Sequence, residues 1–275
     1  MPHPAELLET NGFNQLAKVE NGYCLYNKND IYVGQSIAKY GEFSKLELVL
    51  LTQLCKHGDT VIDVGANIGA HTMGLARQVG ESGCVLAFEP QRIVFQALCA
   101  NIALNSLENV ACYWAAMGTE KGFITVPEVD PTCSNNFGGV SISDVVTGIE
   151  VPCFVLDQFV EVPHISLIKI DVEGMEIDVI KGGQELIKQA RPFLYVENDR
   201  LEKSTELVQT IAELNYDMYW HTPLLYNSEN FYREQKNNYL GIASFNMLCV
   251  PKENPLVVEG LNKIEDFLHH PLRHL

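Results

Sequence analysis

The chain has 275 residues, of which 47% are hydrophobic, and this is enough for one large α/β domain with short additions at its ends. Its net charge of −16 argues against a large basic surface, and therefore against nucleic acid or anionic lipid as a main partner. None of the eight cysteines forms a C-x-x-C pair, the start of the chain lacks signal-peptide blocks, and no apolar run reaches the length of a membrane span. We therefore expect a cytoplasmic protein without membrane segments, and the composition leaves a homo-oligomer open.

Short elements precede the main pattern. Residues 1–22 are polar and predict a loosely attached segment, and residues 23–26 and 31–33 predict a small hairpin. Ser44 and Glu47 form a capping-box pattern that predicts a helix ending near Gly58. We assign residues 1–40 to an N-terminal hairpin and helix extension, residues 41–255 to the main domain and residues 256–275 to a C-terminal tail.

From residue 60 onward, predicted strands and helices alternate. The strands are predicted at 60–64, 84–88, 110–114, 165–170, 193–196, 216–220 and 245–250, and the helices at 68–79, 90–105, 175–180, 205–214 and in a piece that ends at 190. Residues 118–155 and 222–239 interrupt the pattern, the first with short β-like pieces at 123–126 and 151–155. Such alternation is typical of an α/β fold with a doubly wound, mostly parallel, Rossmann-like sheet.

A glycine turn follows the first strand of this pattern. It has the spacing Gly65-Ala66-Asn67-Ile68-Gly69, without the third glycine of the dinucleotide fingerprint. Gly65 permits a close backbone approach, and Asn67 can cap the following helix. Asp63, two residues before the turn, would repel a pyrophosphate but would attract the ammonium group of a methionine moiety, directly or through water.

A second acid ends the next strand. Glu89 can accept hydrogen bonds from both hydroxyls of a ribose, and Pro90 suits the first turn of the next helix. Ala115 and Ala116, after the third strand, would leave room for adenine. Taken together, the two acids and the glycine turn predict binding of S-adenosylmethionine and methyl transfer.

The sequence resembles the FkbM family of S-adenosylmethionine-dependent methyltransferases over about residues 35–250. The matching blocks are Val61-Ile62-Asp63-Val64-Gly65-Ala66-Asn67-Ile68-Gly69, Phe88-Glu89-Pro90 and Leu167-Ile168-Lys169-Ile170-Asp171-Val172-Glu173-Gly174-Met175-Glu176. The resemblance implies a seven-stranded methyltransferase sheet with an antiparallel last strand, acting mainly on hydroxyl oxygens. It does not imply the acceptor, because the substrates of the family are diverse.

Acidic residues follow two further strands. Asp171 and Glu173 come after residues 165–170, and Glu197 comes after residues 193–196, so all three belong to one edge of the predicted sheet. Asp171 is predicted to lie near the transferable methyl group, and the cluster is predicted to supply either a general base or a divalent-cation site. Glu173 has two alternatives, which are capping the next helix and pairing with Lys169. His221 is the other candidate base.

Three functions fit this pattern. The first is an O-methyltransferase for a hydroxyl on a small molecule or glycan, with residues 135–139 and 222–239 either covering the acceptor or forming plain surface loops. The second is a nucleotide-dependent oxidoreductase on a similar sheet. The third is a catalytically silent cofactor-binding subunit.

Overall fold

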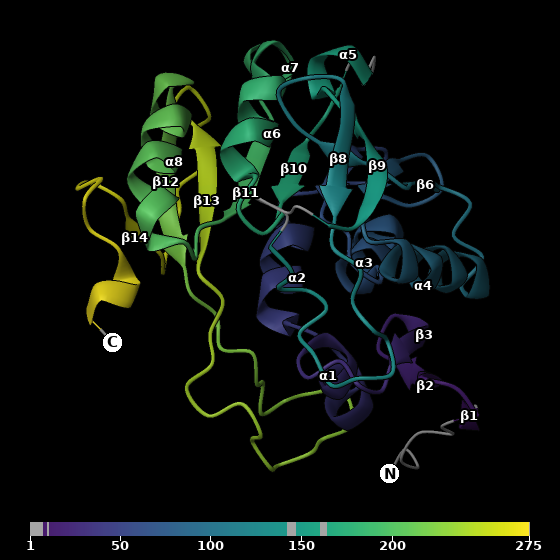
Figure 1. Cartoon of the computed structure of the whole chain (residues 1–275). Helices are drawn as coiled ribbons and strands as arrows, with labels where there is room; N and C mark the ends of the chain where they lie inside the picture. Colours follow the sequence, from purple (N-terminus) through teal and green to yellow (C-terminus); the bar gives the residue numbers. More distant parts are fainter. Residues whose placement is uncertain (1–7, 10, 142–146, 160–163, 275) are drawn as a thin grey trace.

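The computed structural model describes residues 8–9, 11–141, 147–159 and 164–274. Its centre is an eight-stranded sheet, drawn in Figure 1. The strand order is β6 (Val110–Tyr113), β5 (Cys84–Phe88), β4 (Thr60–Val64), β10 (Leu167–Ile170), β11 (Phe193–Glu197), β13 (Asn246–Pro251), β12 (Tyr216–His221) and β14 (Asn262–Lys263). The first five strands of this order are parallel, and β13 is antiparallel to both β11 and β12. The predicted doubly wound sheet with an antiparallel last strand is confirmed, and β14 adds an eighth strand from the predicted tail.

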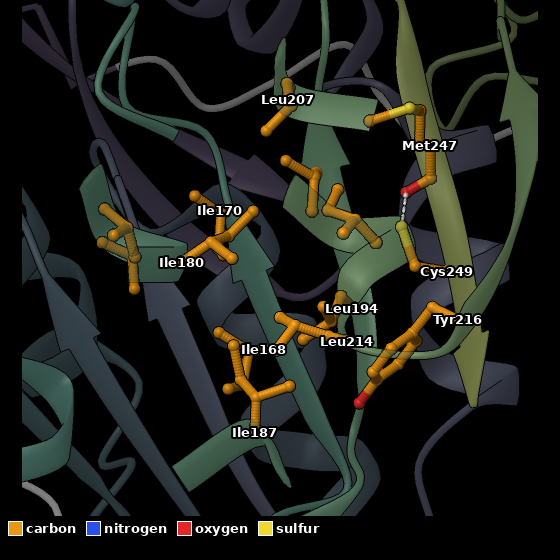
Figure 2. Close-up of a cluster of buried hydrophobic side chains, with 14 of the residues drawn as sticks. Ile168, Ile170, Ile180, Ile187, Leu194, Leu207, Leu214, Tyr216, Met247 and Cys249 are labelled. Atoms are coloured by element: carbon orange, nitrogen blue, oxygen red, sulfur yellow. Dashed lines mark hydrogen bonds between the residues drawn. The ribbon is translucent and has the colours of Figure 1, made fainter. Parts of the chain in front are cut away.

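Helices cover both faces of this sheet. Those of one face are α6 (Glu176–Gly182), α7 (Gln184–Ala190) and α8 (Leu201–Glu213), and those of the other are α2 (Lys45–Gln53), α3 (Ala70–Val79) and α4 (Arg92–Leu104). Figure 2 shows Ile168, Ile170 and Leu194 packed among residues of the first group of helices. Strands buried on both faces are apolar along their whole length, which explains the uninterrupted apolar runs in the sequence.

The N-terminal hairpin differs from the prediction. Its strands are β2 (Asn14–Val19) and β3 (Gly22–Asn27), joined to the short β1 (Leu8–Glu9). Residues 31–32, predicted to begin the second hairpin strand, form a turn instead, and α1 (Val33–Tyr40) begins directly after them. Ala17, Val19, Cys24 and Tyr26 alternate inward and join the core beneath α4. The predicted strand 23–26 lies within β3, but its partner β2 was missed because only two of the six β2 residues are buried, which leaves little apolar alternation in the sequence.

The capping box at the start of α2 is also wrong. Ser44 has a φ of 39° and makes no capping bond to the helix backbone. Its hydroxyl instead donates a 2.5 Å hydrogen bond to the carboxylate of Glu47. Glu47 is 4% exposed and lines the cavity described below.

Two further segments lie outside the main sheet. A small sheet in the order β7 (Ala116–Met117), β9 (Ile149–Phe154) and β8 (Gly122–Val126) lies beside the helix α5 (Leu156–Phe159). The irregular stretch after β12 runs beside α1 in Figure 1, and the Tyr232 N–H donates to the Tyr40 carbonyl across a distance of 3.1 Å. A 3₁₀ turn at Pro271–His274 follows β14. Within the described ranges, no helix is both long enough and apolar enough to cross a membrane.

Candidate active site

A cavity of about 590 Å³ opens at the carboxyl edge of the parallel strands. It collects residues from the ends of β4, β5, β10 and β11, and from the irregular stretch after β12. Eight of the predicted site residues line it: Gly65, Ala66, Asn67, Glu89, Pro90, Asp171, Glu173 and Glu197. Asp63, Gly69, Ala116 and His221 are not among the lining residues.

The glycine turn wraps tightly around the strand ends. Gly65 has a φ of 82°, and a Cβ there would lie 1.7 Å from the Asp171 carbonyl oxygen, so no larger residue fits. Every N–H of the turn already has a partner inside the chain. The N–H groups of residues 65 and 66 donate to the Phe88 carbonyl, and those of residues 67, 68 and 69 donate to the Glu89 carboxylate, the Asn67 side chain and the Ala66 carbonyl. The turn therefore has no free donor of its own for an anion.

Glu89 is held firmly at the end of β5. It is 4% exposed, and its two oxygens accept the N–H of Asn67 at 3.0 Å and the N–H of Gln91 at 2.8 Å. Burial raises the pKa of Glu89 to about 7, although the two backbone hydrogen bonds oppose this shift. Glu89 lines the cavity, and each of its oxygens can accept a further hydrogen bond, as binding of a vicinal diol requires.

Asp63 was predicted to contact the ligand, but its side chain does not reach the cavity. It is fully buried, its Oδ2 accepts the hydroxyl of Thr72 at 2.7 Å, and its Oδ1 lies 3.4 Å from the Lys169 ammonium. A ligand ammonium would therefore have to displace Lys169 to contact Asp63 directly. The buried lysine occupies the place that the sequence had suggested for the ligand.

Lys169 is a central residue that sequence reasoning treated only as an alternative partner of Glu173. Its Nζ lies 3.2 Å from the Asp171 carboxylate and 3.3 Å from the Gly65 carbonyl. Burial alone would lower the pKa of Lys169, but Asp171 and Asp63 outweigh burial and raise it. The signal in the sequence was a single lysine within the apolar strand β10.

Three carboxylates meet beside Lys169. Oxygen atoms of Asp171, Glu173 and Glu197 all lie within 4.8 Å of one another. Burial and then the neighbouring acids raise the pKa of Glu173 to about 8 and that of Glu197 well above its usual range. Carboxylates with raised pKa values are stronger bases than ordinary ones. Carboxylate oxygens are the kind of ligand that Mg²⁺ and Ca²⁺ prefer.

The two alternatives predicted for Glu173, pairing with Lys169 and capping the next helix, are both wrong. Its carboxylate accepts a 2.7 Å hydrogen bond from Arg200 instead of from Lys169. The N-terminal end of α6 is served by Glu176, whose Oε1 accepts the N–H groups of Val172 and Gly174.

His221 and Ala116, like Gly69, are not among the residues that line the cavity. The Nδ1 of His221 is 2.8 Å from the Tyr195 hydroxyl, and burial lowers the pKa of His221. Ala116 is 6% exposed and pairs with Cys153 in the small sheet. Beyond Glu89 the cavity wall is formed by Asn136 and Gly138, which belong to the predicted irregular segment.

Several lining residues have buried polar atoms without a hydrogen-bond partner among the described residues. They include Nε2 of His71, Oε2 of Glu197 and Nδ2 of Asn246. Buried polar groups in native proteins are nearly always paired, so such a group in a cavity wall marks a position for a polar ligand. Neither His71 nor Asn246 was predicted, because no pattern in a single sequence distinguishes them.

Comparisons with known proteins agree with this arrangement. The model of the methyltransferase FkbM domain matches residues 63–218. Methyltransferase 1 of Beauveria bassiana is 28% identical over 143 residues, which cover 44% of this chain and 57% of that protein. Hexuronic acid methyltransferase AglP of Haloferax volcanii is 29% identical over 148 residues, which cover 54% of this chain and 59% of that protein.

Among solved structures, an FkbM methyltransferase from Methylobacillus flagellatus matches with a TM-score of 0.47 and 17% identity, over 69% of this chain and 43% of its own. The chain spans less than two thirds of the length of the curated relatives it matches. Because the family model covers more than half of the residues, the chain belongs to the FkbM methyltransferase family.

Proposed function

We propose that the protein transfers a methyl group from S-adenosylmethionine to a hydroxyl oxygen of a small molecule or glycan. The observation that carries the proposal is the single cavity that joins the glycine turn, the buried carboxylate of Glu89 and the acidic cluster. Family membership supports methyl transfer, and the name of the relative AglP supports a sugar-like acceptor.

The chain's own residues fit this cofactor. Glu89 has the position and the acceptor capacity to bind both ribose hydroxyls. The carbonyl of Gly65, which is bound to Lys169, is an acceptor for an ammonium group at the other end of the ligand. When bound, S-adenosylmethionine would supply a methyl group on a sulfonium, which is already an activated donor.

The acidic cluster would act on the acceptor. A hydroxyl placed between Asp171, Glu173 and Glu197 can give its proton to one carboxylate as its oxygen attacks in line. With its pKa raised to about 8, Glu173 is mostly protonated at neutral pH, so the proton would pass to a carboxylate of the cluster that is ionised. A divalent cation bound by the same oxygens is the alternative, and it would act by lowering the pKa of the acceptor hydroxyl.

A dinucleotide fits the glycine turn less well. A pyrophosphate needs free N–H groups in the turn, and here all five donate within the chain. Moreover, the carboxylate that accepts the Asn67 N–H would lie against the phosphates and repel them.

Calorimetric titrations with S-adenosylhomocysteine and with NAD test the cofactor assignment. We expect binding of the first ligand and none of the second, and the reverse result would refute the proposal in favour of the oxidoreductase. A screen of sugars, lipids and polyketide-like alcohols with labelled donor then tests transfer. Cofactor binding without any transfer would instead support the silent partner subunit.

The role of Asp171 can be tested separately. We expect Asp171→Asn to lower turnover about 10²–10⁴-fold while it changes S-adenosylhomocysteine affinity much less. Asp217→Asn, at a sheet-edge ion pair with Lys263, is the matched control. Loss of wild-type activity in EDTA, restored by Mg²⁺, would identify the cluster as a cation site, and indifference would identify a base. Normal turnover of Asp171→Asn with weaker cofactor binding would reduce Asp171 to a cofactor contact.

A further inference from the structure

The order of the strands gives the cavity two ends. Glu89 and the glycine turn, at β5 and β4, form one end, and the start of β13 forms the other, since β13 lies beyond β10 and β11 in the sheet (Figure 1). The acidic cluster stands between them, at the ends of β10 and β11. An acceptor oxygen that attacks a methyl group in line must approach from the side opposite the sulfonium. The end beside β13 is therefore the place for the acceptor.

This acceptor end has an apolar wall, in contrast to the acidic middle of the cavity. The wall comes from the stretch after β12 and from the 3₁₀ turn after β14, and its apolar side chains are Leu225, Ile242, Phe245 and Leu272. Ser244 is a polar residue of the same wall, whereas Asn246 pairs in register with Glu197 and so belongs to the acidic middle. A ligand at this end meets aliphatic and aromatic side chains, with few groups that could bond additional hydroxyls.

Backbone hydrogen bonds hold the first part of the wall in shape. The Leu225 N–H donates to the Ile242 carbonyl at 3.0 Å, and the Ser244 N–H donates to the Pro223 carbonyl at 3.1 Å. Leu225 also belongs to a small hydrophobic cluster with Tyr40 and Tyr239. The fold itself therefore positions these apolar side chains at the cavity.

A buried histidine fixes the second part of the wall. His270 is 1% exposed, its Nε2 donates to the Asn198 carbonyl at 2.7 Å, and its Nδ1 accepts the Leu272 N–H at 3.1 Å. The His270 ring also lies 4.8 Å from the ring of Trp220. Because Asn198 follows Glu197 directly, these bonds tie Leu272 to the strand end that carries part of the acidic cluster.

We propose that Leu272, together with Leu225 and Ile242, forms an apolar acceptor subsite, and that the acceptor carries its reacting hydroxyl on an apolar body. Burial of apolar ligand surface against these side chains favours binding, whereas each additional hydroxyl facing them would lose water without gaining a partner. The inference rests on the proposed function and selects the apolar small molecule over the glycan. All three residues lie outside residues 63–218, so the family match does not predict this subsite.

Cyclohexanol and myo-inositol test the subsite, because they share a six-carbon ring and differ in the number of hydroxyls. NMR titrations would measure their affinities for the whole protein saturated with S-adenosylhomocysteine, in the wild type, Leu272→Ser and Leu272→Met. We expect cyclohexanol to bind at least about tenfold more tightly than myo-inositol. Leu272→Ser should weaken cyclohexanol about fivefold, and Leu272→Met should change it less than about twofold. Val257→Ser, at an exposed position outside the cavity, is the control and should change neither affinity.

The outcomes separate this inference from the proposed function. If S-adenosylhomocysteine does not bind the wild type, both are overturned. If it binds but cyclohexanol does not, or if myo-inositol binds as tightly as cyclohexanol, the apolar subsite alone is overturned. Unchanged cyclohexanol affinity in Leu272→Ser would show that the alcohol binds elsewhere and would also overturn the subsite. Melting temperatures identify a folding defect, and Ile242→Ser provides the same test in the other part of the wall if Leu272→Ser folds poorly.

Discussion

Replacing Lys169 with methionine should be among the most destabilising single changes in this chain. Lys169 is 3% exposed and lies 3.4 Å from Asp63, which is fully buried. The methionine side chain fills much of the same space, so the change chiefly removes the positive charge. Asp63 would keep the Thr72 hydroxyl as a partner but would lose the compensating cation.

The expected magnitude comes from the two ion pairs. Breaking a buried pair by removing one partner costs about 3–5 kcal/mol, because the other charge stays buried without compensation. We assign this cost to Asp63 and little to Asp171, whose side chain is 36% exposed and can be hydrated. A domain is typically stable by about 5–15 kcal/mol, so the loss is a large fraction of the total.

Urea unfolding followed by circular dichroism would measure the loss. The double variant Lys169→Met with Asp63→Asn removes the stranded charge as well, and it should regain about 1–3 kcal/mol relative to Lys169→Met alone. The reasoning would be refuted if Lys169→Met cost less than about 1 kcal/mol, or if the double variant were no more stable than the single one.

Three further changes probe the cavity. Burial raises the pKa of Glu89 to about 7, so this carboxylate becomes protonated between pH 8 and pH 6, and the affinity for S-adenosylhomocysteine should fall about tenfold over that range. If a Glu89→Gln variant kept the same pH dependence of affinity, another group would be responsible. Burial raises the pKa of Glu197, so the free-energy cost of ionising it in the folded state grows as the pH rises above about 4.5. Glu197→Gln should therefore increase the melting temperature by a few degrees at pH 8 but not at pH 4. Equal gains at both pH values would contradict this reasoning. Gly65→Ala should unfold or greatly destabilise the protein, because the added Cβ would clash with the Asp171 carbonyl. Gly58→Ala is the control, since Gly58 has a similar φ of 89° but an added Cβ would meet no atom nearer than 3.6 Å. Equal thermal shifts for the two variants would show that the clash is relieved elsewhere.

Local patterns predicted the strands and helices of the main sheet well. The runs that became β4, β5, β10 and β11 are mainly apolar, interrupted by Asp63 and Lys169, and glycine or acid marks their ends, so their type and limits follow from the sequence alone. Glu89 was placed correctly at the cavity because it follows the end of its strand directly, and the end of a parallel strand defines the ligand edge.

Predictions that needed knowledge of side-chain partners went wrong more often. The side chains of Asp63 and Lys169 face each other because β4 and β10 pair with these two residues in register, although they are far apart in the sequence. Nothing near either residue specifies that register. Ser44 and Glu47 failed for a related reason, because the Ser44 hydroxyl bonds to the Glu47 carboxylate instead of capping the helix backbone.

The positions of these groups suggest that Asp63 acts on the site indirectly, by holding Lys169 in place, instead of contacting the ligand. Asp63 holds the Lys169 ammonium, and that ammonium in turn binds the Gly65 carbonyl and the Asp171 carboxylate. The Gly65 carbonyl offered to the cofactor's ammonium and the Asp171 carboxylate of the acidic cluster are therefore fixed by one buried cation. If so, Asp63→Asn should weaken cofactor binding indirectly, by loosening Lys169, and Lys169→Met should weaken it as much even in variants that remain folded. A direct contact between Asp63 and the ligand predicts instead that Asp63→Asn weakens cofactor binding more than Lys169→Met does. Calorimetry on the folded variants distinguishes these two cases.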